Sequence, residues 1–152
     1  MADVRIRPAR REDLPRIVEL LADDDLGRGR EHPGGDLSPY AQAFMDIDED
    51  PRNELIVVEA EGAVIATLQL TFILSLTHTG GERAQVEGVR VTAGSRSTGV
   101  GRQLLEWAIS RAQRRGCKTV QLTTDKRRAD ACRFYEALGF GATHEGMKLK
   151  LR

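Results

Sequence analysis

Cysteine is scarce in this chain of 152 residues, which has only Cys117 and Cys132 and no His or Cys beside either. Two such thiols make neither a disulfide framework nor a metal site. Long apolar runs are also missing, because none approaches the ~20 residues that span a bilayer. The first residues, MADVRIRPARREDLP, lack the apolar core of a signal peptide. These absences predict a cytoplasmic protein with no metal and no membrane partner.

An excess of charge of either sign is absent too, since 23 basic side chains balance 23 acidic ones. That balance argues against a protein whose main task is to bind nucleic acid, because phosphate neutralisation dominates such binding. The charges are nevertheless segregated. Residues 1–62 hold 16 acidic and 8 basic side chains, and residues 63–152 hold 7 and 15. This division indicates an anionic ligand on the second half and a cationic one on the first, or a drift of solvated surface charge with no partner.

The first half of the sequence predicts strands and helices separated by turns rich in glycine. Asp13 and Pro15 mark the start of a helix, and four glycines and a proline make residues 27–36 a loop. Glu61-Gly62 separates two β-rich runs and predicts a hairpin. The expected elements are a strand at 5–7, a helix from 13 to about 23, a helix from 38 through 45, strands at 54–60 and 63–74, and a turn at 77–83.

The second half alternates strands with helices. We expect strands at 85–91 and 117–122, helices at 100–115 and 131–138, and a closing strand within 143–151, where MKLKL alternates apolar and basic residues. Strand–helix–strand order implies right-handed crossovers and a parallel pair. The predicted fold class is therefore α/β (α+β): a mixed, mostly antiparallel sheet with a central parallel strand pair and about four helices. No repeat or long linker divides it, so residues 1–152 are expected to form one domain.

The loop between the strand at 85–91 and the helix from residue 100 carries the clearest chemical signal. Gly99 and Gly101 let the backbone turn sharply and approach a ligand closely. The helix start presents unpaired N–H groups and the positive end of its dipole to this loop, which makes an anion site. Arg96 and Arg102 add positive charge at its rim.

Two common nucleotide sites do not fit this loop. A dinucleotide fingerprint requires a third glycine where Leu104 stands, and an acidic residue where Gln121 and Leu122 stand. A P-loop requires Gly-Lys-Ser/Thr after four spacer residues, and the chain has no such run. The glycines then mark either another phosphate site or a simple turn.

Two motifs resemble the GNAT superfamily of acyl-CoA-dependent N-acyltransferases. Arg96-Ser97-Thr98-Gly99-Val100-Gly101 matches its Arg/Gln-x-x-Gly-x-Gly/Ala signature. The run from Ala131 to Phe140 is similar to its second signature, Ala-x-x-Phe-Tyr-x-x-Leu-Gly-Phe. The order of elements resembles the GNAT fold along nearly the whole chain. One departure is Arg128, which stands where many members carry Asn seven residues before the tyrosine, and which puts a side-chain contact from there to the cosubstrate in doubt.

The resemblance implies a role for each part of the loop. The backbone of Val89, Arg90 and Val91 would pair with the pantetheine arm of acetyl-CoA as an added strand. The pyrophosphate would sit on the turn formed by Arg96, Ser97, Thr98, Gly99, Val100, Gly101 and Arg102. The positive second half of the chain agrees with a ligand that carries several phosphates.

Transfer of an acyl group from a thioester to an amine requires a base and an acid. An ammonium acceptor must lose a proton before it attacks a thioester, and Glu87 is the candidate base, directly or through water. The alternative is an ordinary strand glutamate that faces solvent. Tyr135 matches the tyrosine that protonates the departing thiolate in many relatives; the alternative is a core tyrosine packed beside Phe134 and Leu138. The Val89 backbone N–H is the candidate oxyanion donor. Cys132 and Cys117 are interpreted as inert thiols.

These observations predict an acetyl-CoA-dependent N-acetyltransferase that acts on a primary amine by direct attack in a ternary complex. The acidic first half favours a small cationic acceptor, which would enter between the loops at 27–36 and 75–83. The alternative is a GNAT-like module that binds acyl-CoA without catalysis, as a sensor or interaction domain. Homodimers are common among relatives, and the sequence leaves a homodimer open for this chain.

Overall fold

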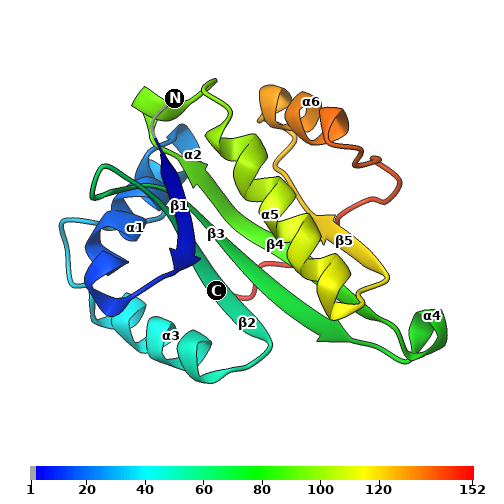
Figure 1. The fold of residues 1–152 in the computed structure, drawn as a ribbon. Helices are drawn as coiled ribbons and strands as arrows, with labels where there is room; N and C mark the ends of the chain where they lie inside the picture. Colours follow the sequence, from blue (N-terminus) through cyan, green and yellow to red (C-terminus); the bar gives the residue numbers. More distant parts are fainter. Residues whose placement is uncertain (1–2) are drawn as a thin grey trace. The chain divides into compact units, whose positions relative to one another are not determined.

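The computed structural model describes residues 3–152 and divides them into two compact units, residues up to 121 and residues 122–152 (Figure 1). Each unit is described by itself. No helix of the described residues is long and apolar enough to cross a membrane.

The first unit is built on a sheet of five strands in the order β1-β2-β3-β4-β5. Its neighbours are antiparallel from β1 to β4, and β4 and β5 form a parallel pair. This arrangement confirms the predicted fold class. The pair lies at one end of the described sheet, since no described strand follows β5. The strands are β1 (Val4–Pro8), β2 (Asn53–Ala60), β3 (Ala63–Leu74), β4 (Glu82–Val91) and β5 (Thr119–Leu122).

Helices cover both faces of this sheet. Leu55 and Val57 of β2 pack in apolar clusters with α1 and α3, whereas Glu54 contacts Arg111 of α5. Because successive strand residues point to opposite faces, α1 and α3 lie on one face and α5 on the other. The helices of the first unit are α1 (Leu14–Ala22), α2 (Asp25–Arg28), α3 (Ser38–Glu49), α4 (Thr77–Gly80) and α5 (Val100–Arg115), with short 3-10 turns η1 (Arg11–Asp13) and η2 (Ala93–Ser95).

Burial on both faces explains why β3 reads as a nearly continuous apolar run. The largest deeply buried side chains come from α1, β2, β3 and α5. The ten largest that are under 2% exposed are Val18, Leu20, Val57, Val58, Thr67, Leu68, Leu70, Phe72, Leu104 and Leu105. The hairpin at Glu61-Gly62 is confirmed. Both residues have positive φ (52° and 78°), which is the geometry of a two-residue turn that matches strand twist.

Asp13 plays a different part from the helix cap expected of it. It makes no side-chain cap to α1. Instead its carboxylate accepts two hydrogen bonds from the Arg7 guanidinium, at 2.7 and 3.0 Å, and one from the Arg10 N–H at 2.7 Å. Arg7 and Asp13 are both buried. The aspartate therefore joins β1 to the start of α1.

The second unit contains α6 (Ala129–Ala137). The closing strand expected within 143–151 is wrong, because residues 141–152 form no strand and every one of them is exposed. A strand exists only where a neighbouring strand completes its hydrogen bonds, and no described strand pairs with this segment. An alternating pattern alone cannot supply that neighbour.

Candidate active site

Strand β4 contains a bulge at Gly88. Gln69 of β3 pairs with Glu87 and Thr67 pairs with Arg90, so the single residue between them on β3 faces both Gly88 and Val89. Gly88 has a φ of 62°, a backbone conformation that favours glycine. A bulge interrupts the ladder and leaves its extra residue unpaired, and bulges occur often beside active sites. Sequence reasoning missed this bulge, although a glycine inside a strand pattern was its signal.

Strand β5 accompanies only the first part of β4. The Lys118 N–H donates to the Glu82 carbonyl at 2.8 Å, and the Gln121 side chain donates to that of Gln85 at 2.6 Å. At Gln121, the last residue of β5 in the first unit, this parallel register has reached only Gln85. No described strand pairs with this edge of β4 beyond that point. The backbone from Gly88 to Val91 therefore presents an open strand edge just after the bulge.

Glu87 lies directly before the bulge and is exposed. Its carboxylate takes part in no ion pair or side-chain hydrogen bond within residues 3–152. An unpaired, accessible carboxylate at this place is compatible with a base, and equally with a solvent-facing strand glutamate.

The Arg90 side chain has two partners within the protein. Its Nε lies 3.3 Å from the Asp24 carboxylate, and its Nη1 donates to the Val89 carbonyl at 2.8 Å. The side chain thus fastens the end of β4 to the connection between α1 and α2. Arg90 can contribute its backbone to a ligand, as predicted for the pantetheine strand, but its guanidinium is occupied.

Residues 92–99 form a tight turn that delivers the chain to α5. The Thr92 N–H donates to the Ile65 carbonyl at 2.8 Å, which ends the β4 ladder. Ser97 and Gly99 both have positive φ (64° and 91°), so the chain turns sharply twice within three residues.

The start of α5 is an unsatisfied helix N-terminus. No side chain caps it at Gly99, and the first helical hydrogen bond runs from the Gln103 N–H to the Gly99 carbonyl at 3.0 Å. The N–H groups of Val100, Gly101 and Arg102 therefore have no carbonyl one turn earlier to bond. Together with the helix dipole, they form an anion-binding position of the kind predicted from the sequence.

Arg96 and Arg102 are exposed at this turn, and each has a partner. Arg96 donates to the carbonyls of Val91 (3.1 Å) and Asp23 (3.2 Å), and Arg102 donates to Glu106 at 2.9 Å. Exposed pairs of this kind stabilise a fold by about 0–1 kcal/mol. Either guanidinium can therefore give up its present partner and bind a phosphate at a small cost in free energy.

Tyr135 belongs to the second unit, where it is half-buried in α6. Its ring packs edge-on against Phe134 and Phe140, with centroids 5.2 and 5.8 Å away. Cys132, on the same helix, donates to Glu136 at 3.4 Å, and that hydrogen bond raises the pKa of the thiol. A raised pKa disfavours the thiolate, as expected for an inert cysteine. Arg128 occupies the N-cap of α6 without a side-chain cap bond.

The predicted acceptor entrance, between the loops at 27–36 and 75–83, stays a prediction. The loop before β4 lies at the tip of the β3–β4 hairpin, where Leu74 pairs with Glu82 (Figure 1). Glu82 is six residues before Gly88 on β4, which is roughly 20 Å along a strand. Leu21, at the end of α1, contacts the position of Gly88.

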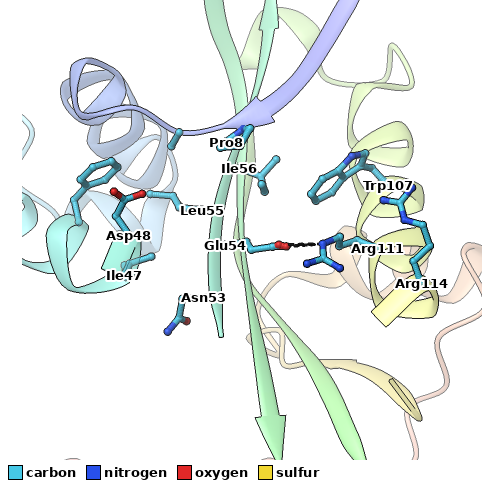
Figure 2. A pocket seen from close by; sticks show the side chains of 12 residues that line it. Pro8, Ile47, Asp48, Asn53, Glu54, Leu55, Ile56, Trp107, Arg111 and Arg114 are labelled. Atoms are coloured by element: carbon cyan, nitrogen blue, oxygen red, sulfur yellow. Dashed lines mark hydrogen bonds and ion pairs between the residues drawn. The ribbon is translucent and has the colours of Figure 1, made fainter. Parts of the chain in front are cut away.

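One cavity in the first unit lies elsewhere. It has a volume of about 400 Å³ and lies between α3, the start of β2 and α5, with Trp107 on its wall beside the ion pair of Arg111 and Glu54 (2.6 Å) (Figure 2). None of the predicted site residues in the described chain lines it. An open strand edge and a helix terminus are shallow surfaces, so the predicted cosubstrate site need not coincide with a deep cavity. Within residues 3–152 no group of three or more His, Cys, Asp or Glu side chains is placed to hold a metal ion.

Comparison with known proteins gives the family. The model of the acetyltransferase (GNAT) family matches residues 14–140, which include the bulge, the turn and α6. The chain belongs to the GNAT family. A Salmonella typhimurium aminoalkylphosphonate N-acetyltransferase is 28% identical over 109 residues, which is 72% of this chain and 70% of that protein.

Solved GNAT-fold structures match nearly the whole chain. A protein from Bacillus halodurans C-125, described as a transcriptional regulator, is 49% identical with a TM-score of 0.94, over 98% of this chain and 100% of its own. A predicted acetyltransferase from Clostridium acetobutylicum, solved with acetyl-CoA, has a TM-score of 0.77 at 20% identity, over 98% of this chain and 97% of its own. At that identity the likeness shows the fold alone.

Proposed function

We propose that this GNAT protein transfers the acetyl group of acetyl-CoA to a primary amine, by direct attack within a ternary complex. One observation carries the proposal: the open edge of β4 after the bulge at Gly88 runs into a glycine-led helix start without a side-chain cap. A ligand with an extended amide arm and a phosphate group fits these two adjoining surfaces, the open edge of β4 and the start of α5.

The cosubstrate would lie along these surfaces in a fixed direction. The pantetheine amides would pair with the backbone of Val89, Arg90 and Val91, as an added strand pairs with a sheet edge. The pyrophosphate would accept hydrogen bonds from the turn and helix start, Arg96 to Arg102, where the dipole of α5 also favours negative charge. The acetyl carbonyl would then lie near the bulge.

The chemical step needs three proton transfers. Glu87 takes a proton from the acceptor ammonium, directly or through water, and the freed amine nitrogen bonds to the thioester carbon. The Val89 N–H stabilises the oxyanion of the tetrahedral intermediate. The C–S bond then breaks, and Tyr135 gives its hydroxyl proton to the departing thiolate. The attacking nitrogen, which gains a positive charge when it bonds to the thioester carbon, loses its second proton to the Tyr135 phenolate, directly or through water, and this leaves the neutral amide, the free thiol and a neutral tyrosine. Because a phenol has a pKa near 10 and a thiol near 8.5, this last transfer needs help from geometry or local charge.

The acceptor in this proposal is a small cationic amine. The unpaired Glu87 carboxylate beside the bulge supports it. The acceptor named for the Salmonella relative, an aminoalkylphosphonate, also carries an amine, joined to an anionic group. An acceptor screen should therefore include polyamines, aminoalkylphosphonates and lysine peptides.

Calorimetric titration of acetyl-CoA tests the cosubstrate site. Gly101→Glu places a carboxylate at the helix start, so we expect it to weaken binding by about 100-fold or more through charge repulsion. Gly94→Glu is the matched control, because its side chain would enter open space in the same turn. Equal affinity of all three proteins would contradict the site. Absence of binding by the wild-type chain would contradict the proposed function itself.

A second candidate is a module that binds acyl-CoA without transferring the acyl group. The description of the Bacillus halodurans relative as a transcriptional regulator favours it. Binding of acetyl-CoA without transfer to any amine of the panel, and without thioester hydrolysis, would support this second function over the first.

The proposed setting is the cytoplasm, in a single functional domain of residues 1–152. The two cysteines are both free, as in reducing compartments. The family match across both units supports the single domain.

A further inference from the structure

The cavity between α3, the start of β2 and α5 exists because β1 ends early. Pro8, the last residue of β1, pairs with Ile56, and the Ala9 N–H makes one more contact, to the Leu55 carbonyl at 2.8 Å. No described strand pairs with this edge of β2 before Leu55. The cavity of about 400 Å³ therefore contains a free strand edge, and its volume is in the range of ligand pockets, ~300–1,000 Å³.

The two walls of this cavity carry opposite charges that are not paired within the described chain. Asp48, on α3, and Arg114, on α5, both line the cavity, and neither forms an ion pair or a side-chain hydrogen bond within residues 3–152. Figure 2 shows Asp48 on one side of β2, and Arg114 with Trp107 on the other. A ligand that bridges the walls gains from a positive group at Asp48 and a negative group at Arg114.

The other two charged side chains of the lining neutralise each other. Arg111 Nε lies 2.6 Å from the Glu54 carboxylate, and the Arg111 guanidinium lies over the Phe72 ring, 5.3 Å from its centroid. Of the two acidic and two basic side chains that line the cavity, Asp48 and Arg114 are thus the pair that remains open to a ligand.

The lining between these charges is apolar and includes a backbone acceptor. Phe44 is buried on the α3 side and Trp107 is half-buried on the α5 side, with Leu55 of β2 also in the lining. Backbone groups alternate in direction along a strand, so the Asn53 carbonyl faces the same open edge as the Leu55 carbonyl. At that edge the Asn53 carbonyl can accept a hydrogen bond from an amide N–H of a ligand.

We propose that this cavity binds a short apolar peptide through both of its charged ends. The N-terminal ammonium lies at Asp48, the C-terminal carboxylate lies at Arg114, and the apolar side chains pack between Phe44 and Trp107. A peptide separates its end charges by up to ~3.5 Å per residue, so two or three residues can bridge walls on opposite faces of a strand. A single amino acid carries both charges on one carbon and can satisfy only one wall.

This peptide site is separate from the proposed cosubstrate position. Because an α-helix rises about 1.5 Å per residue, Trp107 and Arg114 lie roughly 10 and 21 Å along α5 from its start at Val100. Both ligands can therefore bind at once, and the peptide site does not depend on whether the chain transfers an acetyl group.

Tryptophan fluorescence tests the site directly, because Trp107 is the only tryptophan of the chain. Leucyl-leucine is titrated into the wild-type chain, and we expect a saturable change in emission with a Kd on the order of 0.1–1 mM, a typical efficiency for a ligand of this size. N-acetyl-leucyl-leucine lacks the ammonium and leucyl-leucinamide lacks the carboxylate. Each should bind about fivefold more weakly, as for the loss of one exposed charge pair. Absence of a saturable change up to about 10 mM leucyl-leucine would overturn the proposal.

Two variants assign the ends of the peptide. In Asp48→Asn, leucyl-leucine should bind about fivefold more weakly, and its advantage over the N-acetyl derivative should vanish. In Arg114→Gln, its advantage over leucyl-leucinamide should vanish in the same way. Asp46→Asn, on α3, and Arg5→Gln, on β1, remove exposed charges outside the cavity and are the matched controls, which should keep both advantages. An advantage of the free ammonium that persists in Asp48→Asn, or of the free carboxylate that persists in Arg114→Gln, would overturn the proposal.

Discussion

At the scale of single residues, Glu87 is the group on which the proposed proton transfer depends. Glu87→Gln keeps the shape of the side chain and removes its basicity. General bases of this kind contribute about 10²–10⁴-fold to rate, so we expect kcat to fall by at least about 100-fold while the Kd for acetyl-CoA changes less than about twofold. Steady-state kinetics with calorimetry measures both values. Glu61→Gln, at the exposed β2–β3 turn, is the control for the same chemical change. Equal losses in rate and affinity would reject Glu87 as the base.

Tyr135 offers a second test, of the leaving-group step. Tyr135→Phe removes the proton donor and retains the edge-on contacts with Phe134 and Phe140. We therefore expect a single-turnover rate lower by about 100-fold with an unchanged thermal unfolding temperature. Tyr40→Phe is the control, since that hydroxyl binds Glu31 at 2.9 Å, on the loop after α2. An unchanged rate in Tyr135→Phe would mean that solvent protonates the thiolate.

Residue roles could be predicted from the sequence where the backbone alone decides them. The spacing of Gly99 and Gly101 identified the helix start, because glycine freedom and helix ends are local properties. The partner of the Arg90 side chain could not be predicted from the sequence. Its partner Asp24 is 66 positions away in the chain, and only the packing of α1 against β4 brings the two together. The bulge at Gly88 likewise depends on register with β3.

At the scale of elements, the buried pair of Arg7 and Asp13 couples β1 to α1. Removing one partner of a buried pair costs about 3–5 kcal/mol when the other charge is left without compensation. Arg7 also donates to Glu59 at 2.8 Å, so its charge keeps one partner. We therefore expect Asp13→Asn to lower the free energy of unfolding at pH 7 by about 3 kcal/mol, the lower end of that range, measured by urea denaturation. Asp25→Asn is the control, because the pair of Asp25 with Arg28 is exposed and should contribute less than about 1 kcal/mol.

The pair of Arg7 and Asp13 predicts that the free energy of unfolding falls in acid. The hydrogen bond from Arg7 holds the pKa of Asp13 below its ordinary value. The unfolded chain then binds a proton at higher pH than the folded chain, so the stabilisation is complete above an unfolded pKa of about 3.9 and is lost as pH falls through the folded pKa. Unfolding free energies measured from pH 6 to pH 2 should converge for wild type and Asp13→Asn at the acid end. A constant gap over that range would contradict the assignment.

Elements differed in how far the sequence predicted them. The hairpin at Glu61-Gly62 and the helix ended by Gly116 follow from local turn chemistry, and both formed as expected. The short helices α2 and α4 lie in stretches where the sequence pattern predicts turns. Helices of four residues have no apolar periodicity from which they could be predicted. The predicted strand within 143–151 failed for the opposite reason, since its pattern was present and its partner strand was not.

At the scale of the whole molecule, part of the charge segregation is internal. Asp24 pairs with Arg90, Asp23 lies 3.6 Å from Arg96, and Glu54 lies 2.6 Å from Arg111. Each of these pairs joins an acidic residue of the first half to an arginine of the second. The segregation therefore reflects the docking of α1 and β2 against β4 and α5 as well as any ligand. The argument for a cationic acceptor consequently depends on Glu87 more than on net charge.

Thermal unfolding of the whole chain with two ligands separates the phosphate site from the strand edge. Acetyl-CoA at 100 times its Kd should stabilise the fold by about 2.7 kcal/mol, which corresponds to a rise in Tm of roughly 5–10 °C for a protein of this size. S-acetylpantetheine lacks the nucleotide phosphates, so at the same concentration it should raise the Tm less. In Gly101→Glu we expect the two ligands to give equal, small shifts, because the variant blocks only the helix start. If acetyl-CoA kept its advantage over acetylpantetheine in that variant, the phosphates would bind elsewhere than the start of α5.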